Sequence, residues 1–441
     1  MSLKRARHPR ASQRSFPAWM STFLCMIAVL IQSSGIQAAQ LPTTVKDPAT
    51  QAVLKRLPIL SQPGNTPLDA LPLLSKSALS YLGAFSVPHQ DDLGNPLGYG
   101  GYALGYDAAL HGLYFGGHDW YQELCEIGIP ATIELTQTAS ILQNCTDVTE
   151  GRLSLVDQDS IKLGGSLIFN GRLIVSAYSY YDADGSQVLS HFASNPDLSM
   201  QGDVSGPYQV GDWAGIVSGY MTTIPPEWRP AFGGPALTGN CCLSIISRSS
   251  YGPAVSVFNP DNVGMLDPVP AAPILYYPQN HPLAAWDADS AYFNGSTHIV
   301  GMAFPPGSRS VLFFGRQGVG PFCYGTGAEC NDPVDGSKGT HAYPYIHQVW
   351  AFDALDLLAV KEGMRQPWEV KPYALWQLDD MDSTGGANIA GMTYDPTSGM
   401  VYITEMYGES PAVHVYQIQV TGNTVYASTV YLPLMAANIS N

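Results

Sequence analysis

A pattern of two short apolar segments joined by a turn recurs five times between residues 102 and 420. In its first copy, Tyr102-Ala-Leu-Gly-Tyr106 is followed by a turn and then by Leu113-Tyr-Phe-Gly-Gly117. The turns of the five copies contain Asn-Gly, Gly-Asn, or Pro or Asp shortly before Gly, which are residues that close β-hairpins. The pattern therefore predicts a series of antiparallel units.

Each copy continues into a third apolar segment. The first segments of the five copies are 102–106, 166–170, 235–238, 301–304 and 391–394. The second segments are 113–117, 173–178, 243–248, 311–316 and 400–404. The third segments are 123–129, 188–193, 254–258, 348–352 and 413–420. Fourth strands are expected at 207–210, 274–277 and 373–378, and the longest interval has room for a short helix near 354–363.

Repeated four-stranded antiparallel units are typical of a β-propeller. We predict an all-β protein, a β-propeller with five blades favoured, and six or seven possible if the long loops contain further blades. The strand at 82–87 is expected to join the last blade and close the ring, which removes an exposed sheet edge. A pair of β-sandwiches is the alternative fold, but it explains the regular spacing less well.

The N-terminus has the composition of a secretory signal peptide. Five basic residues precede the apolar run 23–31, and small residues follow at 38–39. The run is shorter than the ~20 residues that span a membrane. We predict a signal peptide at 1–39, an extended arm at 40–81, the propeller at 82–435 and a tail at 436–441. The mature protein is then secreted or periplasmic, without a membrane span, and a monomer.

Charge and cysteine content fit that location. The formal net charge is −16 although the N-terminus is basic, so a nucleic-acid partner is not expected. Outside the signal peptide six cysteines remain, an even number that suggests disulfides in an oxidising compartment. Spacing favours pairs between Cys125 and Cys145 and between Cys323 and Cys330, which leaves Cys241 and Cys242 as a vicinal disulfide, as two thiols, or in cross-pairing.

The repeat pattern resembles secreted bacterial β-propeller proteins over residues 82–435. The resemblance concerns the architecture and carries no catalytic motif across, so it implies a fold but no particular activity.

Strand polarity predicts which face of the propeller carries function. In an antiparallel blade, the start of strand one, the end of strand two and the start of strand three lie on one face, and loops on a rigid scaffold often carry sites. The residues expected to bind a ligand there are His118, Tyr178, Tyr181, Arg248, Arg316, Gln317, His347, Tyr407 and His414. The same assignment places Cys241, Asn170 and Pro396 on the opposite face, and Gly100-Gly101, Gly164-Gly165 and Gly233-Gly234 at the starts of first strands.

Two classes of function are open for this face. The first is a binding module for a glycan or a protein. The alternative is a glycoside hydrolase or lyase, for which Glu405 and Asp119 are the candidate catalytic carboxylates. No cofactor or metal is expected. Asp182-Ala-Asp-Gly-Ser186 resembles the front half of a calcium loop but lacks the closing Glu, so a solvated turn is favoured over a calcium site.

Overall fold

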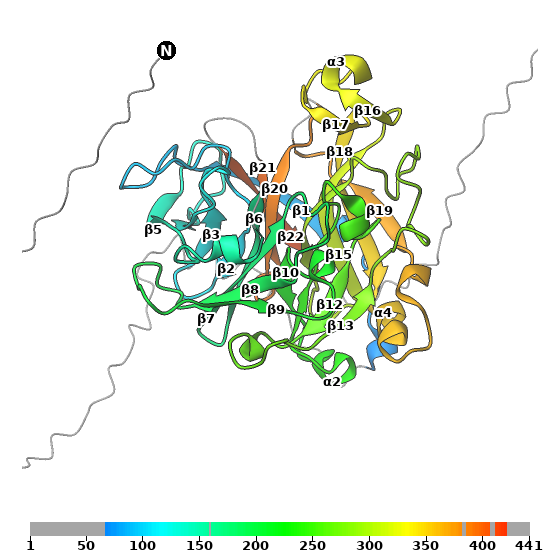
Figure 1. The fold of residues 1–441 in the computed structure, drawn as a ribbon, viewed down its shortest axis with the longest axis horizontal. Coiled ribbons are helices and arrows are strands. Elements are labelled where there is room, and N and C mark those ends of the chain that lie inside the picture. The colour runs from blue at the N-terminus through cyan, green and yellow to red at the C-terminus, as the bar shows by residue number, and fades with distance from the viewer. Residues whose placement is uncertain (1–66, 158–159, 382–384, 406–410, 421–441) are drawn as a thin grey trace, which may run out of the picture. The chain divides into compact units, whose positions relative to one another are not determined.

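The computed structural model describes residues 67–157, 160–381, 385–405 and 411–420. The predicted signal peptide, residues 40–66 of the arm, the tail and Tyr407 lie outside the described residues. In the described part, the strands form five four-stranded sheets and one two-stranded hairpin (Figure 1). Every pairing within the five sheets is antiparallel. The protein is a five-bladed β-propeller, as predicted.

The first four blades follow the chain order from their innermost strand outwards. Blade one contains β2 (Gly105–Asp107), β3 (Gly112–Gly116), β4 (Leu124–Gly128) and β5 (Ser140–Thr146). Blade two contains β6 (Ile161–Phe169), β7 (Arg172–Ser179), β8 (Leu189–Ser194) and β9 (Ser205–Gln209). Blade three contains β10 (Met221–Thr223), β11 (Ala236–Thr238), β12 (Val255–Phe258) and β13 (Ala271–Leu275). Blade four contains β14 (His298–Ala303), β15 (Ser310–Gly318), β18 (Tyr345–Asp353) and β19 (Ala374–Gln377).

Blade five joins the two ends of the described chain. It contains β20 (Ile389–Asp395), β21 (Met400–Glu405), β22 (Ala412–Ile418) and, as its outermost strand, β1 (Leu79–Ser86). The innermost strands contact one another around the ring, β2 with β6, β6 with β10, β10 with β14, β14 with β20, and β20 with β2. The N-terminal strand therefore closes the ring, which confirms that prediction.

In the described part of the chain, the hydrophobic core consists of five clusters, each between two adjacent blades. On β15, Val311 and Phe313 pack into the cluster shared with blade three, whereas Leu312 and Phe314 pack into the cluster shared with blade five. Because successive side chains of a strand point to opposite faces, a strand buried on both faces needs an unbroken apolar run. This explains why the second strands read as continuous apolar segments in the sequence.

Short helices and one hairpin complete the blades. In the described residues the helices are α2 (Arg229–Phe232), α3 (Gly327–Cys330) and α4 (Ala354–Lys361), with 3-10 turns η1 (Leu68–Ala70), η2 (Lys76–Ala78), η3 (Leu153–Leu155), η4 (Ala214–Ile216), η5 (Ile246–Arg248), η6 (Pro260–Asn262) and η7 (Pro367–Glu369). The strands β16 (Cys323–Thr326) and β17 (Lys338–His341) form, with α3, an insertion between β15 and β18 that projects beside β18 in Figure 1. A disulfide between Cys323 and Cys330 joins β16 to α3.

The prediction for the third repeat was wrong by one strand. Residues 235–238 belong to the second strand, β11, not the first, and 243–248 contains no strand but ends in the turn η5. The apolar run from Leu243 to Ile246 cannot extend a strand from Cys241, because Cys242 has a φ of 68°. The actual first strand, β10, has only three residues and offers no apolar run to recognise.

This correction moves the vicinal cysteines to the other face of the propeller. Cys241 follows the end of β11, a second strand, so it lies on the face predicted to be functional and not on the opposite one. Gly233 is also reassigned, because it ends α2 in a left-handed conformation instead of starting a first strand.

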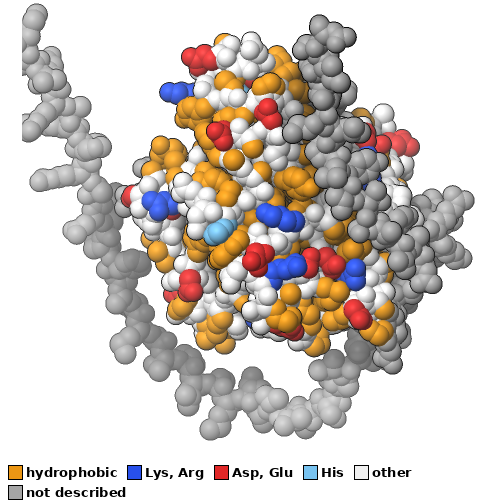
Figure 2. All heavy atoms as spheres, turned by 90° about the vertical axis from the view of Figure 1, so that its right-hand side faces the viewer, with side chains coloured by type: hydrophobic (Ala, Val, Ile, Leu, Met, Phe, Trp, Pro, Cys, Tyr) orange, Lys and Arg blue, Asp and Glu red, His pale blue; other side chains and the backbone are white. Residues whose placement is uncertain are grey.

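Basic and acidic side chains lie side by side on the face drawn in Figure 2, among scattered apolar ones. This is the side on which Figure 1 shows α4 and β19. Near α4, Arg365 and Asp356 are 2.6 Å apart and Arg309 and Asp353 are 3.4 Å apart, so these positive charges are paired.

Blade one contains a buried carboxyl group that makes stability depend on pH. Glu126 on β4 is fully buried, and its Oε1 has no hydrogen-bond partner among the residues that the structure describes. Burial is the main cause that raises the pKa of Glu126 to about 7; the nearby Asp107 raises it further, and the hydrogen bond from Gln143 opposes the shift. A carboxyl whose pKa is raised by folding costs stability as pH rises from its unfolded pKa, about 4, to its folded one.

Glu126→Gln is therefore expected to stabilise the protein at pH 8 by on the order of 2 kcal/mol, because the amide has no charge to bury. The advantage should shrink as the pH falls towards 4, where the carboxyl is neutral in both states. Urea unfolding at pH 8 and at pH 4.5 measures it, and Glu134→Gln, an exposed position of the same blade, is the control. Equal stability of Glu126→Gln and the wild type at pH 8 would contradict the assignment.

Candidate functional site

The first strands of three blades share a register shift near the face that was predicted to carry function. The pairing register shifts between Leu163 and Gly165 in blade two, and at the equivalent steps in blades four and five. A Cβ on Gly165 would lie 2.6 Å from the carbonyl oxygen of Gly219, so the innermost strands meet closely at this level. The residues just before the shift in each of these three strands are part of the lining of the cavities at the mouth of the propeller.

Two adjoining cavities occupy this mouth. The smaller, about 100 Å³, is lined by residues that include Tyr102, Asp119, Lys162, Asn240 and Cys241. The larger, about 380 Å³, is lined by residues that include Tyr180, Cys242, Trp286, Arg316, Asp335 and Asn388. Tyr178, Leu243 and His298 line both, so the cavities are neighbours. The larger volume lies in the range of sites for small molecules.

An ion pair joins blades one and two at the smaller cavity. Lys162 Nζ lies 2.6 Å from Asp119 Oδ2 and 3.1 Å from the carbonyl oxygen of Asp119. Gln122 donates to the same carbonyl oxygen, and its own Oε1 accepts the backbone N–H of Leu163 at 2.7 Å. Asp119 is thus held in place and its charge is balanced by Lys162.

On blade four, two residues opposite each other in the sheet line the larger cavity. His298 on β14 is paired in register with Arg316 on β15. Burial, and then the positive charge of Arg316, lower the pKa of His298 to about 4, so its imidazole is neutral near pH 7. A neutral imidazole offers one hydrogen-bond donor and one acceptor.

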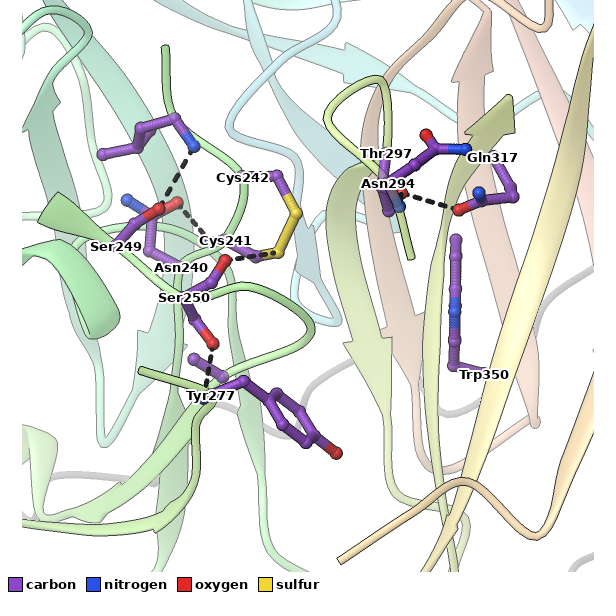
Figure 3. Close-up of a disulfide and its surroundings, with 12 residues drawn as sticks. Asn240, Cys241, Cys242, Ser249, Ser250, Tyr277, Asn294, Thr297, Gln317 and Trp350 are labelled. Carbon is purple, nitrogen blue, oxygen red and sulfur yellow. Dashed lines mark hydrogen bonds between the residues drawn. A yellow bond between two sulfur atoms is a disulfide. The ribbon is translucent and has the colours of Figure 1, made fainter. Parts of the chain in front are cut away.

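A disulfide links Cys241 to Cys242, and the two residues line the smaller and the larger cavity respectively. The Oδ1 atom of Asn240 accepts the backbone N–H of Cys241 at 2.9 Å, and Cys241 Sγ lies 3.7 Å from the carbonyl oxygen of Ser250. Figure 3 shows the disulfide beside these partners and facing the segment with Asn294 and Thr297. The disulfide is therefore part of the mouth.

Of the predicted residues, the structure brings Asp119, Tyr178 and Arg316 together in the lining of the mouth. Burial, and then the negative charge of Asp119, raise the pKa of Tyr178 above its ordinary value. His118 lies beside Asp119 in the chain, and its ring packs near Tyr99, Trp120 and Tyr121 at centroid distances of 5.6, 5.6 and 5.5 Å. Tyr181 is exposed and lines neither cavity.

Glu405 does not occupy the register position in blade five that Arg316 occupies in blade four. In the sheet register it occupies the position that Gly315 has in blade four, one residue before that of Arg316. Because side chains alternate along a strand, Glu405 points to the other side of its blade. It lines neither cavity, so the structure does not bring the two candidate carboxylates into one cavity.

His414 connects Glu405 to the closing strand. Its Nε2 lies 3.0 Å from Glu405 Oε2, and its Nδ1 lies 3.0 Å from the hydroxyl of Tyr81 on β1. These three side chains belong to the outer three strands of blade five and link them.

The other predicted residues have structural contacts. Arg248 donates to the carbonyl oxygens of Asp182 and Ala183, in the loop after β7. Gln317 is fully buried, and its Oε1 accepts from the hydroxyl of Thr297 at 2.6 Å. His347 is buried on β18, opposite Arg316 in the register. None of the three lines the two cavities.

Sequence reasoning missed Lys162, His298 and Asn388, which take equivalent places at the starts of the first strands of blades two, four and five. The sequence contained a signal for these residues, because the starts of first strands were expected on this face. The prediction named only the glycines at those starts. Lys162 and His298 are the positions paired with Tyr178 and Arg316, so aligning the repeats residue by residue would have found them.

The described residues offer no group of metal ligands and no long apolar helix. No three His, Cys, Asp or Glu side chains there form a group suited to a metal ion. In the segment that resembles a calcium loop, Asp182 Oδ1 accepts the backbone N–H of Ser186 at 2.7 Å, and Asp184 accepts from the Ser186 hydroxyl at 2.9 Å. No helix in the described part is long and apolar enough to cross a membrane.

Comparison with protein-family models gave no match, and comparison with curated proteins gave none either. Among solved structures, the chain is similar to a GH43 endo-arabinanase from Bacillus licheniformis (10% identity, 72% of this chain and 93% of that chain, TM-score 0.38). It is also similar to a GH130 glycoside hydrolase that targets β-1,2-mannosidic linkages in Candida mannan (9%, 83% and 96%, 0.36) and to a luciferin-regenerating enzyme (7%, 76% and 95%, 0.31). At these values the similarities carry no argument about activity. The fold and the site define a five-bladed β-propeller with a ligand-sized cavity at its mouth.

Proposed function

We propose that the protein is a secreted, monomeric binding module that holds part of a glycan in the mouth of the propeller. The observation that carries this proposal is the lining of the larger cavity, in which Tyr178 and Trp286 accompany neutral polar groups such as His298 and Asn388. Aromatic rings provide flat apolar surface for the C–H face of a sugar, and neutral donors and acceptors match its hydroxyl groups. The three disulfides support an extracellular location.

Two other ligands or activities fit the site less well. A protein ligand would need a broad contact surface, whereas these cavities are concave and small enough for one or two sugar rings. Hydrolysis by paired carboxylates would need both groups at one cavity, but Asp119 is paired with Lys162 and Glu405 lines neither cavity. Binding without turnover is therefore the proposal.

A glycan array followed by titration calorimetry tests the proposal, with the incubated glycans checked for cleavage. Tyr178→Ala is expected to weaken the best ligand about tenfold or more, because the side chain lines both cavities. Tyr181→Ala is the matched control, since Tyr181 is a neighbouring tyrosine outside the lining. Thermal unfolding of both variants shows that they are folded.

Three results would contradict the proposal. These are a folded protein that binds no glycan, cleavage of the glycan that is abolished in Glu405→Gln or Asp119→Asn, and a Tyr181→Ala effect as large as that of Tyr178→Ala.

A further inference from the structure

Arg316 is a positive charge at the mouth without an acidic partner among the residues that the structure describes. It lines the larger cavity, and none of the ion pairs in the described part of the chain includes it. Its Nε is buried and has no hydrogen-bond partner there. The buried Nε atom therefore lacks the hydrogen bond that normally offsets its loss of water, while the side chain as a whole is partly exposed towards the cavity.

The guanidinium of Arg316 is held in position by an aromatic ring. It lies over the ring of Tyr345, 4.6 Å from the centroid. The Tyr345 hydroxyl donates to Asp332 Oδ2 at 2.5 Å, and Asp332 is itself fully buried against His341. The ring is therefore fixed at both ends, by the strand and by the buried carboxylate. Stacking leaves the in-plane N–H groups of an arginine available to an acceptor.

The other ionisable groups that line the mouth do not balance Arg316. Lys162 and Asp119 neutralise each other at 2.6 Å. Asp335 lines the same cavity as Arg316, but it forms no ion pair with it, and its Oδ1 accepts the backbone N–H of Ser337 at 2.9 Å. His298 is neutral near pH 7, because burial lowers its pKa to about 4. Among the described residues, the lining of the mouth thus supplies no acidic group paired with Arg316.

We propose that Arg316 binds the carboxylate or sulfate group of an acidic sugar, so that the glycan held in the mouth is anionic. This inference rests on the proposed function, since it names the class of glycan. Planar anions such as carboxylates accept two parallel N–H bonds from a guanidinium, and such charge-assisted bonds are stronger than neutral ones. The nearby Tyr178 and Trp286 would then contact the sugar ring that carries the anion.

The test compares each acidic glycan bound on the array with a neutral counterpart that differs in charge alone. The counterpart is the carboxyl-reduced sugar for a uronate and the desulfated sugar for a sulfate ester. The mature protein should bind the acidic form at least about tenfold more tightly than the neutral one. Arg316→Gln should abolish this preference, and Arg316→Lys should reduce it, because lysine keeps the charge but not the planar pair of donors.

Arg365→Gln is the control for loss of one positive charge, because Arg365 pairs with Asp356 away from the mouth. It should leave the preference unchanged. If Arg316→Gln does not fold, the Arg316→Lys comparison decides instead. Binding of neutral glycans only would overturn this inference and leave the proposed function standing, as would a preference for acidic forms that survives both Arg316 variants. A folded protein that binds no glycan would overturn both.

Discussion

Replacing Phe85 with alanine is expected to lower the free energy of unfolding by about 3–5 kcal/mol. Phe85 is fully buried on β1, paired with Val413, and it packs in the cluster between blades five and one. The loss is large because the side chain belongs to the strand that closes the ring. A cavity there weakens both the outer edge of blade five and its contact with blade one.

Leu82→Ala on the same strand is the matched control. The Leu82 side chain is 41% exposed, so its truncation should change stability by no more than about 0.5 kcal/mol. Urea unfolding followed by tryptophan fluorescence measures both variants. A Phe85→Ala loss below about 1 kcal/mol would show that the ring does not depend on this strand.

Asp332→Asn is expected to cost about 3–5 kcal/mol, because it removes one member of a buried ion pair. Asp332 Oδ2 accepts from His341 Nδ1 at 2.8 Å and from the Tyr345 hydroxyl, and Oδ1 accepts two backbone N–H groups, those of Val334 and Asp335. An amide at this position would turn an N–H₂ group towards some of these donors.

Asp356→Asn is the control, since it breaks the exposed pair with Arg365 and should cost less than about 1 kcal/mol. Equal losses in the two variants would contradict the argument. Asp332 fixes the Tyr345 ring on which the Arg316 guanidinium stacks. Asp332→Asn should therefore also weaken the preference for acidic glycans.

The effect of Asp332→Asn should depend on pH in a defined direction. The pKa of Asp332 is lowered: burial opposes this, but hydrogen bonds donated by Tyr345 and then by His341 favour the carboxylate. The pKa of His341 is raised: burial again opposes this, but the hydrogen bonds that His341 makes to Asp332 and to the Ser337 carbonyl favour the protonated imidazole. The contribution of Asp332 is present above about pH 4 and is lost as the pH falls further. That of His341 is present below about pH 6.5 and is lost as the pH rises through its folded pKa. The difference between wild type and variant should therefore be largest between these limits.

Much of the architecture was predictable from the sequence because it depends on local patterns. The hairpin turns and apolar segments identified four of the five units correctly, and the short strand before them was correctly assigned to ring closure. The helix expected near 354–363 is α4. Blade three was misread because β10 is too short to leave a pattern and because the residues after Cys242 only resemble a strand.

The site depended on information that no local pattern contains. The sequence by itself determined repeated antiparallel units that close into a ring, with five blades favoured over six or seven, and it predicted the face on which loops gather polar residues, since period-two alternation and turn chemistry act between near neighbours. Only the tertiary structure decided which of those residues meet. The first strands change register where they reach the mouth, and ring closure brings Lys162, Cys241, His298 and Arg316 together from three blades. Glu405 shows the reason most directly, because a displacement of one residue along a strand turns its side chain to the other side of the blade.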